Sequence, residues 1–159
     1  MNESALTAYA LALLVGGVAG LRTLTAPAVV SWASRLGRLH LGATWLAFFG
    51  YAWTPWFLTL LAIGEFIVDQ LPSTPSRTEP PGFVGRIVTG ALSGAAVGTA
   101  GGTMIGGLVA GIAGAAIGTL AGHALRARLA AAFGRDRPAA FIEDAIALGG
   151  ALVIWTALR

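Results

Sequence analysis

The chain alternates long apolar runs with short polar segments, a pattern that predicts membrane-spanning helices. Ala5–Leu21 is an apolar run of 17 residues, close to the roughly 20 that cross a bilayer as a helix. Apolar character resumes after Arg22 and continues to Ser34. One helix over both runs would be about 45 Å long, longer than a hydrocarbon core of roughly 30 Å. We therefore expect this helix to be broken near residues 20–27, where Pro27 removes a backbone hydrogen bond.

Further apolar segments predict four more spans. The second runs from Pro55 to about Leu71, after an aromatic segment, Leu41–Trp53, typical of interfacial or re-entrant pieces. The 36 residues of Ile87–Gly122 carry no charge. As one helix they would be about 54 Å long, so we expect two helices joined by a tight turn at Gly101-Gly102. The last span is about Pro138–Leu158. The expected fold is all-α, a transmembrane bundle of about five spans, with four or six also compatible.

Composition supports one membrane domain over residues 1–159. Hydrophobic residues make up 56% of the chain and charged residues 11%, against roughly 25% charged in soluble domains. All ten basic residues are arginine, and the net charge is +3. They stand singly or in pairs rather than on one solvated face, which argues against nucleic-acid binding. The chain has no cysteine and no metal-ligand spacing, so we expect neither a metal nor a cofactor.

The arginines also predict an orientation. With five spans, one side would carry six arginines and the other side three, and the richer side is expected to face the cytoplasm. That side would hold a basic loop between the last two spans and also the N-terminus. The six are Arg77, Arg86, Arg126, Arg128, Arg135 and Arg137, and the three are Arg35, Arg38 and Arg159.

Glycines recur at every fourth position in the charge-free region. Small residues at this spacing form a flat helix face that lets two backbones approach closely. The pattern predicts a glycine zipper, and the partner helix could lie in the same chain or in another subunit of a homo-oligomer. The glycines are Gly90, Gly94, Gly98, Gly102 and Gly106, followed by Gly114, Gly118 and Gly122.

Charged residues inside apolar segments are the candidates for function. A charge at the bilayer centre costs roughly 2.5–3.5 kcal/mol on insertion scales, and such residues usually face the interior of a bundle. Glu65 and Asp69 lie four apart, on one helix face, so one of them should hold a proton or both should share a cation. Arg22, beside Thr23 at the expected break, could pair with them or hold an anion. Secondary candidates are Glu143, Asp144 and His123.

Several short motifs resemble a known family. They are Gly20-Leu21-Arg22-Thr23 followed by Pro27, Glu65-x-x-x-Asp69-x-x-Pro72, Pro75-Ser76-Arg77-Thr78, and Arg86-x-x-x-Gly90-Ala91-Leu92. Together they are similar to the bacterial membrane proteins grouped as domain-of-unknown-function family 4126. The resemblance implies a small polytopic protein of the bacterial cytoplasmic membrane, and it carries no activity with it. It adds Arg77 and Arg86 to the candidate site.

Three functions compete on these observations. The favoured one is a transporter or channel for a small solute or ion that uses the intramembrane carboxylates and arginine. The alternative is a structural or assembly protein whose glycine face packs an oligomer or a partner. The third is an enzyme on lipid headgroups, with Arg22, Arg77 and Arg86 holding phosphate. No histidine–carboxylate or metal motif supports it, so we expect no enzyme.

Overall fold

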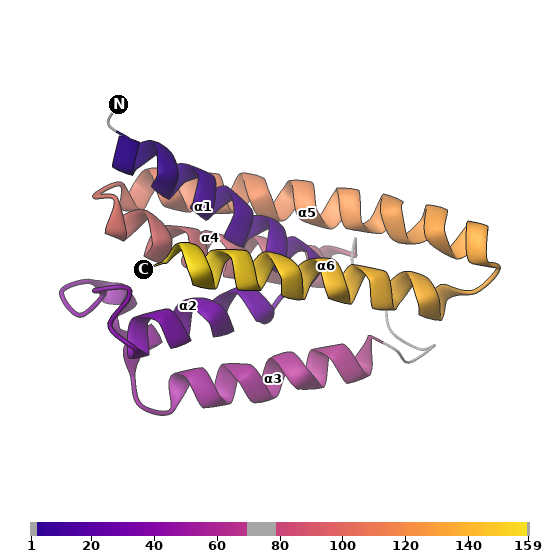
Figure 1. Ribbon diagram of the computed structural model, residues 1–159, viewed down its shortest axis with the longest axis horizontal. Helices are drawn as coiled ribbons and strands as arrows, with labels where there is room; N and C mark the ends of the chain where they lie inside the picture. Colours follow the sequence, from indigo (N-terminus) through magenta and orange to yellow (C-terminus); the bar gives the residue numbers. More distant parts are fainter. Residues whose placement is uncertain (1–2, 70–78, 159) are drawn as a thin grey trace.

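A computed structural model describes residues 3–69 and 79–158, and within these ranges the chain is helical with short connections (Figure 1). The regular elements in chain order are α1 (Glu3–Leu21), α2 (Thr25–Arg35), the 3-10 helix η1 (Trp45–Gly50), α3 (Thr54–Val68), α4 (Pro80–Ala100), α5 (Met104–Phe133) and α6 (Asp136–Ala157). The all-α bundle expected from the sequence is therefore confirmed.

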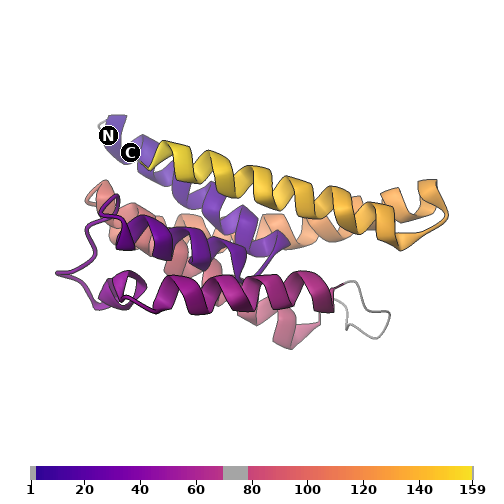
Figure 2. The same cartoon turned by 60° about the horizontal axis from the view of Figure 1, so that its bottom comes forward.

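The helices lie roughly along one direction, so the bundle has two ends (Figure 1). The terminus end holds the starts of α1 and α3, η1, the α4–α5 turn and the last turn of α6. The α5–α6 end holds the turn between those two helices, the last turn of α3 and the first turn of α4. α1 runs away from the terminus end, and α2 turns back toward it (Figures 1 and 2).

Within the described ranges, four helices, α1, α4, α5 and α6, are long and apolar enough to cross a membrane, and α3 is a shorter apolar helix of 15 residues. Their outward faces carry large apolar side chains, among them Leu60 on α3, Ile105 on α5 and Leu152 on α6. Water would solvate such a surface poorly, whereas lipid chains match it. These features are compatible with an integral membrane protein.

The centre of the bundle is built from α1, α4 and α5, which meet through glycines. A Cβ added at Gly98 on α4 would lie 2.7 Å from the Cα of Gly107 on α5. Gly94 likewise faces Gly107 and Gly111, and Gly118 faces the backbone of Gly17 on α1. Backbones therefore touch where ordinary helices would be separated by side chains.

The predicted glycines do not all serve this contact. Gly90, Gly94 and Gly98 face α5, and Gly114 and Gly118 face α1. Gly106 packs against the Tyr9 ring, Gly102 lies in the α4–α5 turn with φ of +67°, and Gly122 is buried on α5. The contacts described here all lie within one chain.

Two predicted interruptions of the helices are present in the structure, and one predicted loop is not. The break after α1 and the turn at Gly101-Gly102 are confirmed. The predicted basic loop is wrong, because α5 continues through Arg126 and Arg128 to Phe133 and only Gly134 and Arg135 separate it from α6. The alanine-rich segment after Arg128 favours helix, and the helix ends at Gly134, whose φ of 66° suits a left-handed cap.

The placement of the N-terminus beside Arg126–Arg137 is also wrong. The N-terminus lies at the terminus end and the α5–α6 turn lies at the opposite end (Figures 1 and 2). The physical reason is α2, which carries the chain back toward its starting end. α1 and α2 together therefore begin and end at the same end of the bundle (Figures 1 and 2).

Candidate functional site

Arg22 lies in the break between α1 and α2 and is completely buried. Its Nη1 donates to the Asp69 carboxylate at the end of α3, and its Nη2 donates to the Asp144 carboxylate on α6. The ring of Phe66 lies beneath the guanidinium, with its centroid 4.9 Å from Cζ. One arginine thus joins the break to two helices that are distant in sequence.

Glu65 caps the start of α2. The first amides of a helix have no partner within it, and the N-cap residue of α2, Leu24, has no side chain that could accept from them. The Glu65 carboxylate accepts instead, from the amide of Thr23 at 2.7 Å and from that of Leu24 at 2.9 Å. Arg86 of α4 lies on the other side, with Nη2 3.9 Å from Glu65 Oε1.

The opposite edge of the break packs against α5. The hydroxyl of Thr119, which is completely buried, lies 3.2 Å from the carbonyl oxygen of Gly20 and 2.8 Å from that of Ala115 on its own helix, so the two carbonyls share its one hydrogen. Backbone groups released by a break in a membrane helix need such partners, because no water is present to replace them. The break is therefore a built feature of the fold, capped by α3 at its amide side and in contact with α5 at its carbonyl side.

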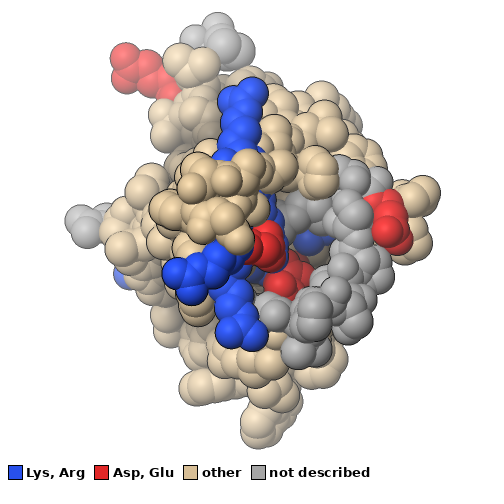
Figure 3. Space-filling model, turned by 90° about the vertical axis from the view of Figure 1, so that its right-hand side faces the viewer, with Lys and Arg blue, Asp and Glu red and all other residues tan. Residues whose placement is uncertain are grey.

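Arg126 on α5 connects these buried groups to the surface. Its Nη1 lies 3.6 Å from Glu143 Oε2 and 3.9 Å from Asp69 Oδ2. Its Nε donates to Asp136 Oδ1 at 2.9 Å, and the Asp136 side chain is 59% exposed. Seen from the α5–α6 end, the molecule is hollowed, with acidic side chains inside the hollow and basic side chains beside it (Figure 3).

We define the charged cluster as the seven side chains that these contacts bring together in the described part of the chain. They are Arg22, Arg86 and Arg126 with Glu65, Asp69, Glu143 and Asp144. Three guanidinium groups and four carboxylates are thus gathered in one region, and Arg126 joins them to Asp136.

No group of three histidine, aspartate or glutamate side chains within residues 3–69 and 79–158 is arranged to hold a metal ion.

The structure gathers most of the sequence-predicted site. Arg22, Glu65, Asp69 and Arg86 lie together, joined by the secondary candidates Glu143 and Asp144, and Thr23 contributes its backbone amide. His123 is exposed on α5, outside these contacts. Arg77 lies outside the described residues.

Sequence reasoning missed the role of Arg126, which it assigned to a loop. A signal for that role was present. Gly114, Gly118 and Gly122 recur at a spacing of four, and Arg126 continues it, which places it on the same side of α5 as the buried glycines.

No protein-family model, curated protein or solved structure matches this chain. The resemblance to domain-of-unknown-function family 4126 remains a prediction from its motifs.

Proposed function

We propose that the protein is a membrane transporter or channel for a small solute or ion, and that the charged cluster is its site. The observation that carries the proposal is the gathering of ionisable side chains from four helices at a broken helix inside an apolar bundle. Broken helices with ionisable groups at membrane depth are the usual construction of ion and solute sites in transporters.

Stability alone is a poor reason to keep this cluster. Replacing buried ion pairs by apolar residues of similar volume is often neutral or stabilising by about 1–4 kcal/mol. Seven charged side chains in one region of the bundle are therefore better explained by a function than by stability. Exchange of a proton or cation is a function that needs such groups.

Asp69 is the group best placed for exchange. It is shared between the buried Arg22 and the partly exposed Arg126, and its own side chain is 13% exposed. If the charge of Asp69 were removed, Arg22 would keep Asp144 as its charged partner, and Arg126 would keep Glu143 and Asp136. The link that Arg22 makes between α3 and α6 depends on that charge.

Proton flux tests the proposal directly. Purified protein is reconstituted into vesicles that contain the pH indicator pyranine, and flux is driven by a potassium gradient with valinomycin. We expect flux above that of protein-free vesicles, reduced to their level by Asp69→Asn. Glu3→Gln is the matched control, because Glu3 is an exposed carboxylate at the terminus end. Wild-type flux equal to that of empty vesicles, or unchanged flux in a correctly folded Asp69→Asn variant, would refute the proposal.

One observation favours the structural alternative. Arg22 already bonds to two carboxylates, an arrangement that would lock α1, α3 and α6 together with no transported species. The glycines, by contrast, are used within the chain and lend no support to a partner interface. If the cluster is only a lock, Asp69→Asn lowers the stability of the protein while wild-type vesicles show no flux.

A further inference from the structure

A second candidate site lies at the terminus end, on the lipid-facing surface between α2 and α6. Here an apolar groove of about 430 Å³ is lined by Val29, Trp32, Leu36, Ala151, Leu152 and Trp155, and no polar atom contributes to its exposed lining. The Trp32 indole N–H is turned away to the hydroxyl of Thr59, 3.0 Å distant. The ring therefore presents only apolar surface to the groove.

The groove follows the membrane direction. Val29, Trp32 and Leu36 occupy one side of α2 at spacings of three and four, and they are matched on α6 by Ala151 and Trp155. From Val29 to Leu36 the wall is about 10 Å long at 1.5 Å per residue. Such a wall suits a flexible hydrocarbon chain that lies along the helices.

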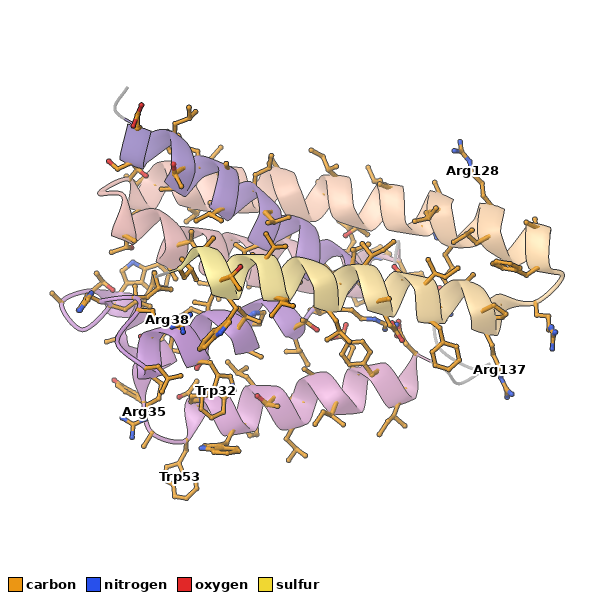
Figure 4. The ribbon with its side chains drawn as sticks, in the orientation of Figure 1. Trp32, Arg35, Arg38, Trp53, Arg128 and Arg137 are labelled. Carbon is orange, nitrogen blue, oxygen red and sulfur yellow. The ribbon has the colours of Figure 1, made fainter. Side chains whose placement is uncertain are left out.

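Two arginines lie where this groove reaches the terminus end. Trp32, Arg35 and Arg38 lie near one another there, whereas Arg128 and Arg137 lie toward the opposite end (Figure 4). Arg35 is exposed in the last turn of α2. Arg38 donates to the carbonyl of Trp155 at 2.8 Å, and its Cζ lies 3.9 Å from the centroid of the Trp155 ring. Positive charge is therefore fixed at the rim of a wholly apolar groove.

We propose that this groove binds an anionic phospholipid, with an acyl chain between α2 and α6 and the phosphate beside Arg35 and Arg38. The two parts of the site match the two parts of the ligand. Apolar walls take the chain, and guanidinium groups take the phosphate through charge-assisted hydrogen bonds. The site lies apart from the charged cluster and does not depend on the proposed transport.

Quenching of tryptophan fluorescence measures occupancy, because Trp32 and Trp155 line the groove. The test uses full-length protein in which Trp45, Trp53 and Trp56 are changed to phenylalanine, in mixed micelles. Phosphatidylglycerol or phosphatidylcholine with brominated acyl chains is titrated in. Each arginine near an anionic headgroup contributes about 1 kcal/mol, equivalent to about fivefold in affinity. We expect phosphatidylglycerol to quench at a correspondingly lower mole fraction.

Variants separate the site from general lipid contact. Arg35→Gln, which leaves the Arg38–Trp155 contact intact, should lower the preference for phosphatidylglycerol about fivefold. Arg128→Gln and Arg137→Gln, made as two separate variants that each lose one charge at the other end, should leave it unchanged. Ala151→Leu, which fills the groove, should weaken quenching by both lipids. Equal quenching by the two lipids in the parent protein, or equal effects of the two sets of arginine variants, would overturn the proposal.

Discussion

At the scale of single residues, Arg22 determines the state of the charged cluster. It is completely buried and holds Asp69 and Asp144, which come from α3 and α6. Its Nε has no hydrogen-bond partner among the described residues, so its interactions are concentrated on these two carboxylates. Removal of its charge would leave two acids facing each other in a region of low polarity.

We expect Arg22→Met to destabilise the protein by about 3–5 kcal/mol, because breaking a buried ion pair leaves uncompensated charge. The measurement is the unfolding midpoint of detergent-purified protein on titration with sodium dodecyl sulfate. Arg128→Met is the control, because Arg128 is exposed on α5, and it should stay within about 0.5 kcal/mol of wild type.

A compensated variant identifies the cause. Arg22→Met combined with Asp69→Asn and Asp144→Asn removes all three charges and should recover much of the lost stability. If Arg22→Met is as stable as wild type, or if the added substitutions only lower stability further, buried charge does not explain the effect of Arg22.

The sequence was sufficient to select part of this cluster and insufficient to complete it. Arg22, Glu65 and Asp69 interrupt apolar runs, and charge in hydrocarbon is unfavourable enough to mark them. Glu143 was predictable only as a residue near the start of the last span. That it approaches Arg126 depends on the register between α5 and α6, which no local pattern encodes.

At the scale of elements, α5 organises the bundle because its glycines lie against two helices at once. Gly107 and Gly111 contact α4, while Gly114 and Gly118 contact α1. The repeat of four predicted close packing, since every fourth residue of a helix lies on nearly the same side. It could not predict the partners, because α1 contributes Gly16, Gly17 and Gly20, and a single pair of glycines four apart, Gly16 and Gly20, is weak evidence of close packing.

We expect Gly94→Ala to destabilise the protein by about 1–3 kcal/mol, because an added methyl in a filled contact forces the backbones apart. Its Cβ would lie 2.7 Å from the Cα of Gly111. Gly149→Ala on α6 is the matched control, since nothing lies within 4 Å of a Cβ at that position. There alanine should be neutral or stabilising by up to about 1 kcal/mol. Thermal unfolding in detergent measures both, and equal changes in the two variants would contradict the packing account.

At the scale of the whole molecule, the chain reverses direction before α2 and again after it. These two reversals determine the membrane topology. A helix broken at residues 22–24 was predictable from length alone. The direction of the second half was not, because apolar periodicity is the same whether a helix continues or doubles back. The partners of the break come from other helices, since Glu65 of α3 accepts from its two amides and Thr119 of α5 contacts the carbonyl of Gly20.

This reversal predicts a specific topology, which single cysteines can test because the natural chain has none. The N-terminus and the connector between α2 and η1 lie at the terminus end, and Arg137 lies at the other (Figures 1 and 4). We expect Glu3→Cys and His40→Cys to react with a membrane-impermeant maleimide from one side, and Arg137→Cys only from the other. The arginines around the α5–α6 turn favour the cytoplasm for that end, so intact cells should label the first two. Labelling of Glu3→Cys and Arg137→Cys from the same side would show that the first segment crosses the membrane without returning, as charge counting alone suggests, and would remove the basis for a site at the break.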